Sequence, residues 1–234
     1  MAKALIFGGT FNPVHVGHLR SAIEVSEVLD FQRVDWVPSY APYHKTEQPL
    51  LGFDLRVALL RAALNGHERF HVNDIEKRLP VPSITIQTLE AMAEAEPSVE
   101  RYFLLGDREF LRLHKWRRAR EVVGLTHVVI GCRTEFDFDE FASAVEAAWP
   151  QSRRVSPAAG ALMAFELTPG RNAVVVPLPR IEISSSFVRS RWLEGRSLSQ
   201  LVPDGVVELL EQNRVAVETA WRAGKAPDFT AQQG

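Results

Sequence analysis

The sequence predicts an α/β protein in which a doubly wound parallel sheet has helices on both faces and is followed by a small C-terminal helical part. Short apolar segments alternate along the chain with longer segments that repeat apolar residues at helical spacing. The first apolar segment ends in two glycines directly before a helical pattern, where open α/β sheets bind ligands. The chain has 234 residues, 46% of them hydrophobic, which is enough to bury a core without disulfides.

The individual elements follow from local patterns. Apolar or β-branched runs predict strands at 4–7, 33–37, 70–72, 101–105, 126–132 and 173–176. Apolar residues at helical spacing predict a helix that begins at Val16 and helices at 54–64, 84–92 and 140–149. Ser83 precedes the third of these helices and could cap it.

Three segments do not follow this alternation. Prolines at 38, 42 and 49 predict a long loop that ends at residue 50. Within residues 134–170, the stretch SRRVSPAAG indicates a loop. We expect residues 1–214 to form one domain and residues 215–234 to form a C-terminal tail whose last ten residues are mobile.

Charge and cysteine content exclude several classes of protein. The 27 basic and 29 acidic side chains give a net charge of -2 and no overall drive toward nucleic acid or an anionic membrane. No apolar run approaches the roughly 20 residues of a membrane span, and the N-terminus has no signal-peptide cleavage pattern. The single cysteine, Cys132, excludes an intrachain disulfide and a cysteine-based zinc cluster. We therefore expect a cytoplasmic protein with small-molecule partners and no nucleic-acid or membrane partner; a homo-oligomer is compatible with the sequence.

The stretch GGTFNPVHVGH, residues 8–18, has the features of a phosphate site. Gly8, Gly9 and Thr10 let backbone N–H groups approach phosphate oxygens without interference from a Cβ atom. The helix that starts near Val16 adds unpaired N–H groups and its dipole. His15 and His18 are three residues apart and therefore share one face of that helix.

Three interpretations of the two histidines remain open on these residues alone. A metal site is disfavoured, because two histidines without a nearby carboxylate make a poor ligand set. Stabilisation of negative charge on a phosphoryl group in transit suits them better, since imidazolium donates charge-assisted hydrogen bonds to phosphate oxygens. The third interpretation is a turn followed by two helix-surface histidines.

A second candidate anion site is ISSSFVRSR, residues 183–191. Its three serines lie between a strand and a helical pattern, so they can cap that helix. Arg189 offers two parallel donors to a phosphate group. A serine-rich cap without any ligand is the alternative interpretation.

Together, these two stretches resemble the nucleotidylyltransferase superfamily. GGTFNPVHVGH resembles its G-S/T-F-D/N-P-x-H-x-G-H signature, and ISSSFVRSR resembles I-S-S/A-T-x-I/V-R, with Ser186 where Thr is usual. The resemblance implies a Rossmann-like fold over residues 1–214, with His15, His18 and Arg189 as catalytic residues. It implies that ATP is bound by Gly8, Gly9, Thr10, Phe11, Asn12, His15, His18, Gly106, Ile183, Ser184, Ser185, Ser186 and Arg189.

Three middle segments resemble the bacterial nicotinate-nucleotide adenylyltransferases within that superfamily. These are VPSYAPYHK at 37–45, LPVPSITIQTLEAM at 79–92 and FLLGDREFLRLHKW at 103–116. In the third segment Asp107 directly follows Gly106, and Arg108 occupies the usual position of the acid. The resemblance implies that the second substrate is bound by Lys45, Ile84, Thr85, Trp116 and Arg133.

The resemblance also implies the reaction: transfer of the adenylyl group of ATP to nicotinate mononucleotide, giving deamido-NAD and pyrophosphate. By the same resemblance, Trp116 stacks on the pyridine ring, Lys45 lies near phosphates, and the N–H groups of Ile84 and Thr85 hold the carboxylate. Mg²⁺ is expected with ATP, bound by phosphates and waters rather than by protein ligands. The alternatives are a nicotinamide-mononucleotide or other small-molecule adenylyltransferase, and a non-catalytic nucleotide-binding module.

Overall fold

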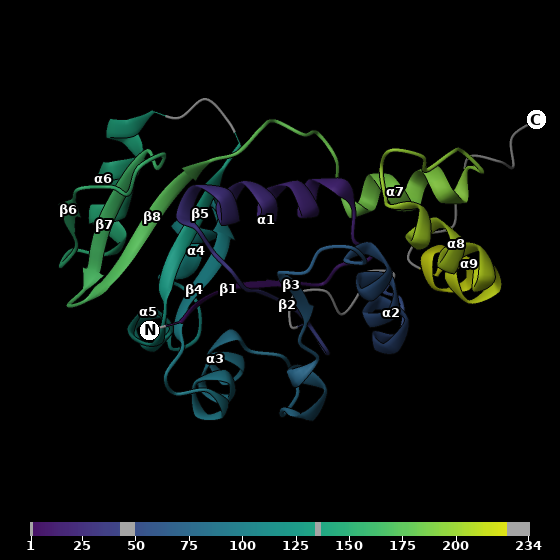
Figure 1. Ribbon diagram of the computed structural model, residues 1–234, viewed down its shortest axis with the longest axis horizontal. Helices are drawn as coiled ribbons and strands as arrows, with labels where there is room; N and C mark the ends of the chain where they lie inside the picture. The colour runs from purple at the N-terminus through teal and green to yellow at the C-terminus, as the bar shows by residue number, and fades with distance from the viewer. Residues whose placement is uncertain (1, 43–49, 134–136, 224–234) are drawn as a thin grey trace, which may run out of the picture.

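The computed structural model describes residues 2–42, 50–133 and 137–223 (Figure 1). Its centre is an eight-stranded sheet with the order β3-β2-β1-β4-β5-β8-β7-β6. The strands are β1 (Lys3–Gly9), β2 (Val34–Pro38), β3 (Phe70–Val72), β4 (Glu100–Gly106), β5 (His127–Cys132), β6 (Arg153–Val155), β7 (Met163–Thr168) and β8 (Arg171–Pro177). Six neighbouring strands, from β3 to β8, pair in parallel, which confirms the predicted fold class.

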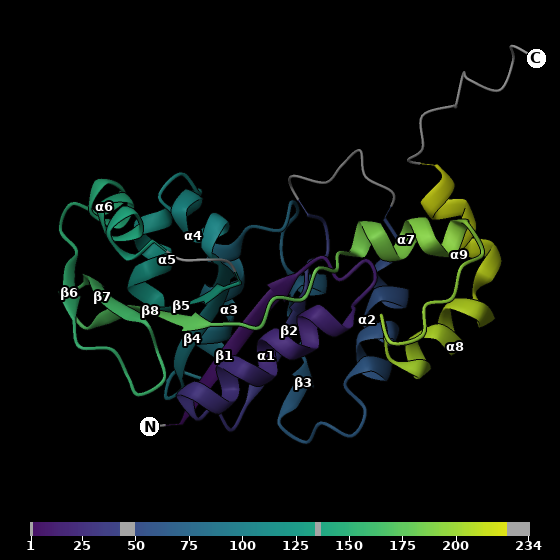
Figure 2. The same cartoon turned by 90° about the horizontal axis from the view of Figure 1, so that it is seen from above.

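Helices cover both faces of the sheet, as predicted. One face packs against α1 (Val16–Leu29), α2 (Phe53–Ala63), α7 (Ser185–Leu193), α8 (Asp204–Gln212) and α9 (Arg214–Arg222). The other packs against α3 (Thr85–Ala95), α4 (Asp107–Leu113), α5 (Ala119–Leu125) and α6 (Phe138–Ala148). Figures 1 and 2 show α1 on one side of the sheet, while Figure 1 shows α3 on the other. Each face of the sheet has its own hydrophobic core. Adjacent residues of β1 point to opposite faces, so Leu5 packs in the core under α1 and Ile6 in the core under α3.

The edge of the sheet formed by β6, β7 and β8 differs from the prediction. β7 pairs antiparallel with both β6 and β8, so this edge is not parallel. β6 lies inside the stretch that indicated a loop, and β7 lies in the segment for which no strand was predicted. β7 and β8 are joined by a tight turn in which Thr168 pairs with Arg171 and Gly170 has φ of 75°. The Pro-Gly dipeptide at 169–170 was the available signal for this hairpin.

The C-terminal part corrects the predicted domain boundary at residue 214. Residues 214–222 form helix α9 rather than a tail. Val217 and Trp221 on this helix are 0% and 1% exposed, and the Trp221 ring lies edge-on against Trp192 at 6.2 Å between centroids. Because these two apolar side chains are four residues apart, they share one helix face and bury together. Residues 224–234, where mobility was predicted, lie outside the described residues.

Ser83 does not have the capping role that its position suggested. The residue that precedes α3 is Ile84, and no side chain caps this helix. Instead, the Ser83 hydroxyl accepts a hydrogen bond from Ala41 N at 3.0 Å, and Ser83 N donates to Ala41 O at 2.9 Å. These bonds, with a parallel bridge between Ser83 and Pro42, attach the chain after β2 to the start of α3.

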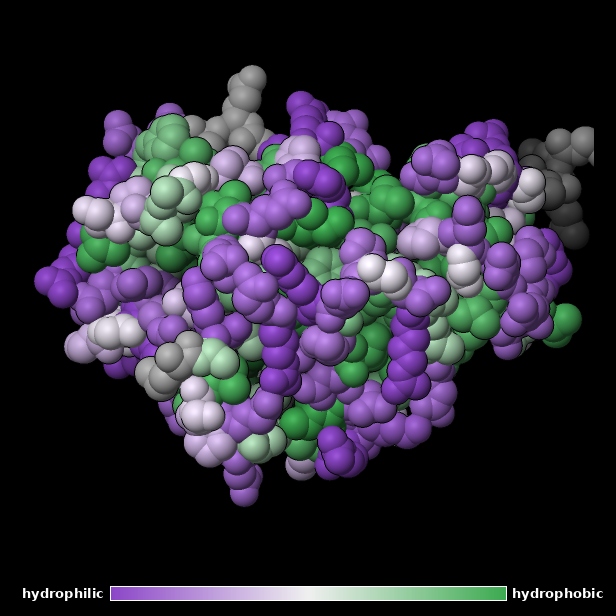
Figure 3. Space-filling model, viewed as in Figure 1, coloured by the Kyte–Doolittle hydropathy of each residue, from purple (hydrophilic) through white to green (hydrophobic). Residues whose placement is uncertain are grey.

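Exposed apolar side chains are dispersed over the surface. Figure 3 shows hydrophilic residues over most of the face seen in Figure 1, with smaller hydrophobic areas between them. The exposed large hydrophobic residues of the described chain are Tyr40, Val81, Phe138, Phe187 and Val215, which belong to different elements. Within residues 2–42, 50–133 and 137–223, no helix has the length and apolar content that a membrane span requires.

The sheet order places a ligand crevice beside β1. From β1 the chain proceeds to β2 and β3 on one side, and then returns to β4 and β5 on the other. In open parallel sheets, a crevice opens outside the carboxyl ends of the strands where the order reverses. The chain that follows β1 and the helix that follows β4 should therefore border a binding site.

Candidate active site

A cavity of about 580 Å³ lies at this position. It is lined by Thr10, Phe11, Asn12, His15, His18, Leu50, Glu109, Arg133, Ile183, Ser184, Ser185, Ser186 and Arg189. Both predicted phosphate-binding stretches therefore border the same space, although more than 160 residues separate them along the chain. The three predicted catalytic residues, His15, His18 and Arg189, all line it.

The loop between β1 and α1, residues 10–13, forms one wall of the cavity; we call it the motif loop. Phe11 has φ of 47°, which is unusual for a bulky residue. A Cβ atom on Gly9 would lie 2.9 Å from the Phe11 ring, so the tight approach of this ring requires glycine. Gly8 and Gly9 are not among the lining residues, and their contact with phosphate stays a prediction.

The two histidines stack at the start of α1. Their ring centroids are 3.7 Å apart with an angle of 27° between planes. His15 N donates to Nδ1 of His18 at 3.2 Å, which assigns the proton of a neutral His18 ring to Nε2. Gly17 between them is required by packing, since a Cβ atom there would lie 2.6 Å from Cγ2 of Ile183. The glycine of the H-x-G-H motif thus allows α1 to approach the second phosphate-binding stretch.

The protonation of His15 differs from the imidazolium that we expected. Burial, together with the positive charge of Arg133, lowers the pKa of His15 to about 4. His15 is 3% exposed and is therefore neutral at pH 7 in the free protein. An anionic ligand in the cavity would raise this pKa, because a nearby negative charge favours the protonated ring.

The second stretch makes direct contact with the motif loop. Ser184 caps α7 by accepting a hydrogen bond from Phe187 N at 3.1 Å, as predicted for these serines. The Ser185 hydroxyl donates to Pro13 O at 2.9 Å, and Arg189 donates to Asn12 O at 2.9 Å and to the Ser186 hydroxyl at 3.0 Å. The two phosphate-binding stretches therefore form one continuous wall.

Two lining residues were not predicted, Glu109 and Leu50. Glu109 lies on α4, the helix that directly follows β4, and this placement after a strand was the available signal. By contrast, Asp107 turns its carboxylate toward its own helix and accepts from Arg108 N at 2.7 Å. Gly106 precedes α4 and is exposed, but it is not among the lining residues. Its predicted contact with ATP therefore stays a prediction.

The residues predicted for the second substrate are dispersed. Arg133 lines the cavity and donates to the Ser21 hydroxyl at 2.9 Å. Ile84 and Thr85 lie at the start of α3, and Trp116 packs edge-on against Phe103 at 6.4 Å between centroids. None of these three lines the cavity, so their contacts with a substrate stay predictions. Lys45 lies outside the described residues.

The charges around the cavity suit a polyphosphate. Arg133 and Arg189 contribute positive charge, two histidines add ring donors, and Glu109 contributes a carboxylate. In the part of the chain that the structure describes, no group of three or more His, Cys, Asp or Glu side chains is placed to hold a metal ion.

Comparison with known proteins agrees with this geometry. The family model described as cytidylyltransferase-like matches residues 6–191. A Pelobacter propionicus protein named "Probable nicotinate-nucleotide adenylyltransferase" is 31% identical, over 92% of this chain and 99% of its own length. A protein of the same name from Maridesulfovibrio salexigens is 29% identical, over 94% of this chain and its own full length.

Solved structures show the same fold at lower sequence identity. A Plasmodium falciparum nicotinic acid mononucleotide adenylyltransferase superposes with a TM-score of 0.68 at 16% identity, over 92% of this chain and 98% of that one. The family match covers both phosphate-binding stretches, and the similarity to the Pelobacter propionicus relative covers nearly the whole chain. The chain therefore belongs to the cytidylyltransferase-like family and, within it, to the nicotinate-nucleotide adenylyltransferases.

Proposed function

We propose that the protein transfers the adenylyl group of ATP to nicotinate mononucleotide, which gives deamido-NAD and pyrophosphate. The observation that carries this proposal is the shared cavity, in which Arg189 and Ser185 of one phosphate-binding stretch bond to the motif loop of the other. The near full-length similarity to nicotinate-nucleotide adenylyltransferases supports the choice of substrates.

The chemistry needs no nucleophile from the protein. An oxygen of the 5′-phosphate of nicotinate mononucleotide attacks the α-phosphorus of ATP and forms a new P–O bond. The bond between the α-phosphorus and the bridging oxygen breaks, and pyrophosphate leaves with that electron pair. The protein contributes position and charge stabilisation, as in other phosphoryl transfers.

The lining residues have separate roles in this step. Nε2–H of His18 donates to an oxygen of the α-phosphate as negative charge develops in the transition state. Arg189 and the hydroxyls of Ser185 and Ser186 hold the β- and γ-phosphates. His15 enters neutral and becomes protonated as the triphosphate raises its pKa.

Mg²⁺ accompanies ATP in this proposal and neutralises part of its phosphate charge. When bound, it would take its ligands from phosphate oxygens and waters.

We propose that the second substrate binds with its carboxylate at the start of α3, as the family resemblance implies. The start of α3 presents the N–H groups of Ile84 and Thr85, and a helix N-terminus favours a carboxylate over a neutral amide. Trp116 packs edge-on against Phe103 and offers a ring face for a pyridine. We therefore expect the substrate to be nicotinate mononucleotide, which carries the carboxylate, rather than nicotinamide mononucleotide, which carries the amide.

The test supplies ATP and Mg²⁺ with either nicotinate mononucleotide or nicotinamide mononucleotide, and measures release of pyrophosphate. We expect turnover with the acid to exceed turnover with the amide by at least about tenfold. Turnover with neither substrate would reject the adenylyltransferase and favour a nucleotide-binding module. A preference for the amide would reject the role of α3 and leave the reaction itself in place.

A further inference from the structure

Two side chains that do not line the cavity hold the motif loop from behind. Arg56 comes from α2 and Trp221 from α9, and both are buried, with exposed fractions of 0% and 1%. Each makes a hydrogen bond to a residue that lines the cavity: Arg56 to Thr10 and Trp221 to Asn12. Neither residue belongs to the stretches that resemble the family motifs.

Arg56 joins three segments around the site. Its guanidinium donates to Thr10 O at 2.8 Å, to Leu51 O at 3.0 Å and to Tyr40 O at 3.4 Å. These carbonyls belong to the motif loop, to the segment before α2 and to the loop after β2. Burial lowers the pKa of Arg56 to about 10, although Glu76 opposes this shift. Burial of a guanidinium is costly, and the three carbonyl acceptors offset part of that cost, which ties the position of Arg56 to the segments that supply them.

Trp221 reaches the same loop from the opposite end of the sequence. Its indole Nε1 donates to Oδ1 of Asn12 at 3.3 Å, and Leu51 N donates to the same oxygen at 3.1 Å. The main-chain oxygen of Asn12 accepts from Arg189. Both the side chain and the backbone of Asn12 are therefore fixed by groups from other elements.

The residue between these two contacts is Phe11, whose φ is 47°. A bulky residue keeps such a conformation only where its surroundings over-determine it. Arg56 fixes the carbonyl of Thr10, and in a trans peptide the following N–H points the opposite way. The N–H of Phe11 is thereby directed away from Arg56. Phe11 itself lines the cavity.

We propose that Arg56 and Trp221 are positioning residues for ATP, which hold the motif loop in the conformation that binds phosphate without touching the nucleotide. This inference rests on the ATP site of the proposed function. It predicts that loss of either contact lets Phe11 relax and weakens nucleotide binding beyond any effect on folding.

The test measures binding of α,β-methylene ATP with Mg²⁺ by titration calorimetry, and thermal unfolding of the same full-length variants. R56K keeps the charge but loses the planar fork, and W221F keeps the buried ring but loses the N–H donor. R101K is the matched control, because Arg101 is also buried and donates to backbone carbonyls, but at the other end of the sheet. We expect Kd to rise at least about tenfold in R56K and about fivefold in W221F, the scale of lost hydrogen bonds.

In R101K we expect Kd to stay within about twofold of wild type while Tm falls. The proposal is overturned if R56K and W221F bind the analogue as wild type does, whatever their Tm. It is also overturned if R101K weakens binding as much as R56K, since the effect would then report general destabilisation. If wild type binds α,β-methylene ATP but turns over neither mononucleotide, the proposed reaction is rejected. The positioning role is then still decided by the Kd values of R56K, W221F and R101K.

Discussion

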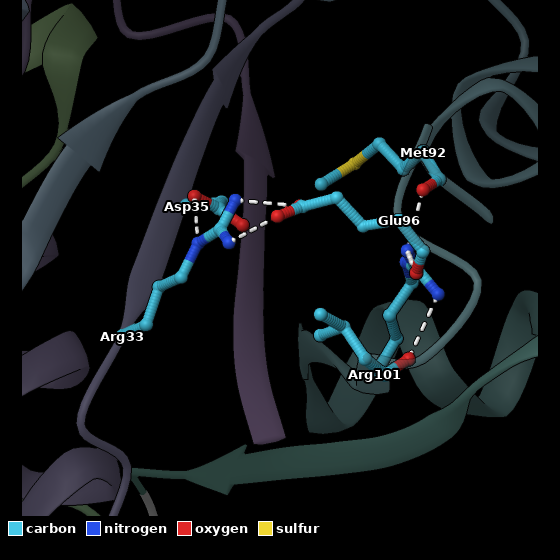
Figure 4. Close-up of polar contacts among 6 residues, drawn as sticks. Arg33, Asp35, Met92, Glu96 and Arg101 are labelled. Carbon is cyan, nitrogen blue, oxygen red and sulfur yellow. Dashed lines mark hydrogen bonds and ion pairs between the residues drawn. The ribbon is translucent and has the colours of Figure 1, made fainter. Parts of the chain in front are cut away.

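The two ends of the parallel sheet hold arginines in contrasting surroundings. At the amino ends of the strands, Arg33 donates to Asp35 at 3.0 Å and to both oxygens of Glu96 at 2.7 and 2.8 Å (Figure 4). Arg101 donates to the carbonyls of Met92, Glu96 and Val99. These contacts attach the end of α3 to β2 and β4, and the positive charge of Arg33 is matched by two carboxylates.

At the carboxyl ends of the strands, the described arginines contact backbone carbonyls and hydroxyls, with no carboxylate partner like those of Arg33. Arg189 donates to a carbonyl and a hydroxyl, Arg133 donates to a hydroxyl, and Arg56 donates to three carbonyls. Burial accordingly lowers the pKa of Arg189, whereas the carboxylate of Glu96 raises that of Arg33. The amino end therefore matches Arg33 with carboxylates that stabilise the fold, while the carboxyl end keeps the positive charge of Arg133 and Arg189 at the cavity.

The largest expected effect is at the carboxyl end. His18→Ala removes a donor to the transition state, so kcat should fall about 100- to 1000-fold. Because His18 also stacks on His15 and accepts a hydrogen bond from His15 N, a modest fall in Tm of about 2–4 °C should accompany the kinetic loss. Steady-state kinetics and a thermal melt of the same preparation measure both quantities. A near-normal kcat would remove His18 from the mechanism and would break the contrast between the two ends.

Arg33→Met makes the corresponding change at the amino end. It leaves the carboxylate of Asp35, which is 2% exposed, without its partner. Because Arg33 itself is partly exposed, loss of the partner of this buried carboxylate should cost about 1–2 kcal/mol of unfolding free energy, measured by urea titration. The kcat and KM of the variant should stay within about twofold of wild type. A selective loss of kcat at unchanged stability would show that this end also serves catalysis.

The pH dependence of stability tests the burial of His15. The pKa of the folded protein's His15, about 4, lies below the ordinary value of 6.5, so between these values only the unfolded chain binds the proton. The free energy of unfolding is therefore unaffected by His15 above pH 6.5. It decreases as pH falls from 6.5 toward 4, because protonation then favours the unfolded chain. At pH 5 the loss should be about 2 kcal/mol, measured by urea titrations at pH 5 and pH 8.

His15→Gln is the control for this titration. Burial also lowers the pKa of His127 at the amino end, so part of the acid sensitivity belongs to that residue. The difference between wild type and His15→Gln isolates the contribution of His15. Identical pH dependence in the two proteins would contradict the assignment of a neutral, buried His15.

The smallest expected effect concerns two helical glycines. Gly17→Ala places a methyl group against Ile183 and should separate α1 from the second stretch, which lowers kcat/KM about tenfold. Gly124→Ala is the matched change, because no atom lies within 4 Å of its added Cβ. It should stabilise α5 by about 0.5–1 kcal/mol and leave kcat/KM unchanged. Equal kinetic effects in the two variants would contradict the packing role of Gly17.

Much of the site could be predicted because its signals are local. The phosphate-binding stretches show their glycines, histidines and serines within about ten residues each, and the strands that precede them are short apolar runs. The β6–β7 edge gave weaker signals, since β6 has three residues, two of them exposed arginines. Helix α9 was missed because only two of its apolar side chains, Val217 and Trp221, are buried, and the exposed Val215 blurs the apolar stripe.

The α/β class, the two predicted phosphate-binding stretches and their family could be inferred from residue order alone. The neutral state of His15, the position of Glu109 in the cavity, and the contacts of Arg56 and Trp221 with the motif loop emerged from the folded structure. The first set depends on spacing along the chain, which fixes helix faces, strand ends and capping groups. The second depends on burial and on hydrogen bonds such as that from Trp221 to Asn12, which joins residues 209 positions apart and exists only once the sheet and its helices have packed.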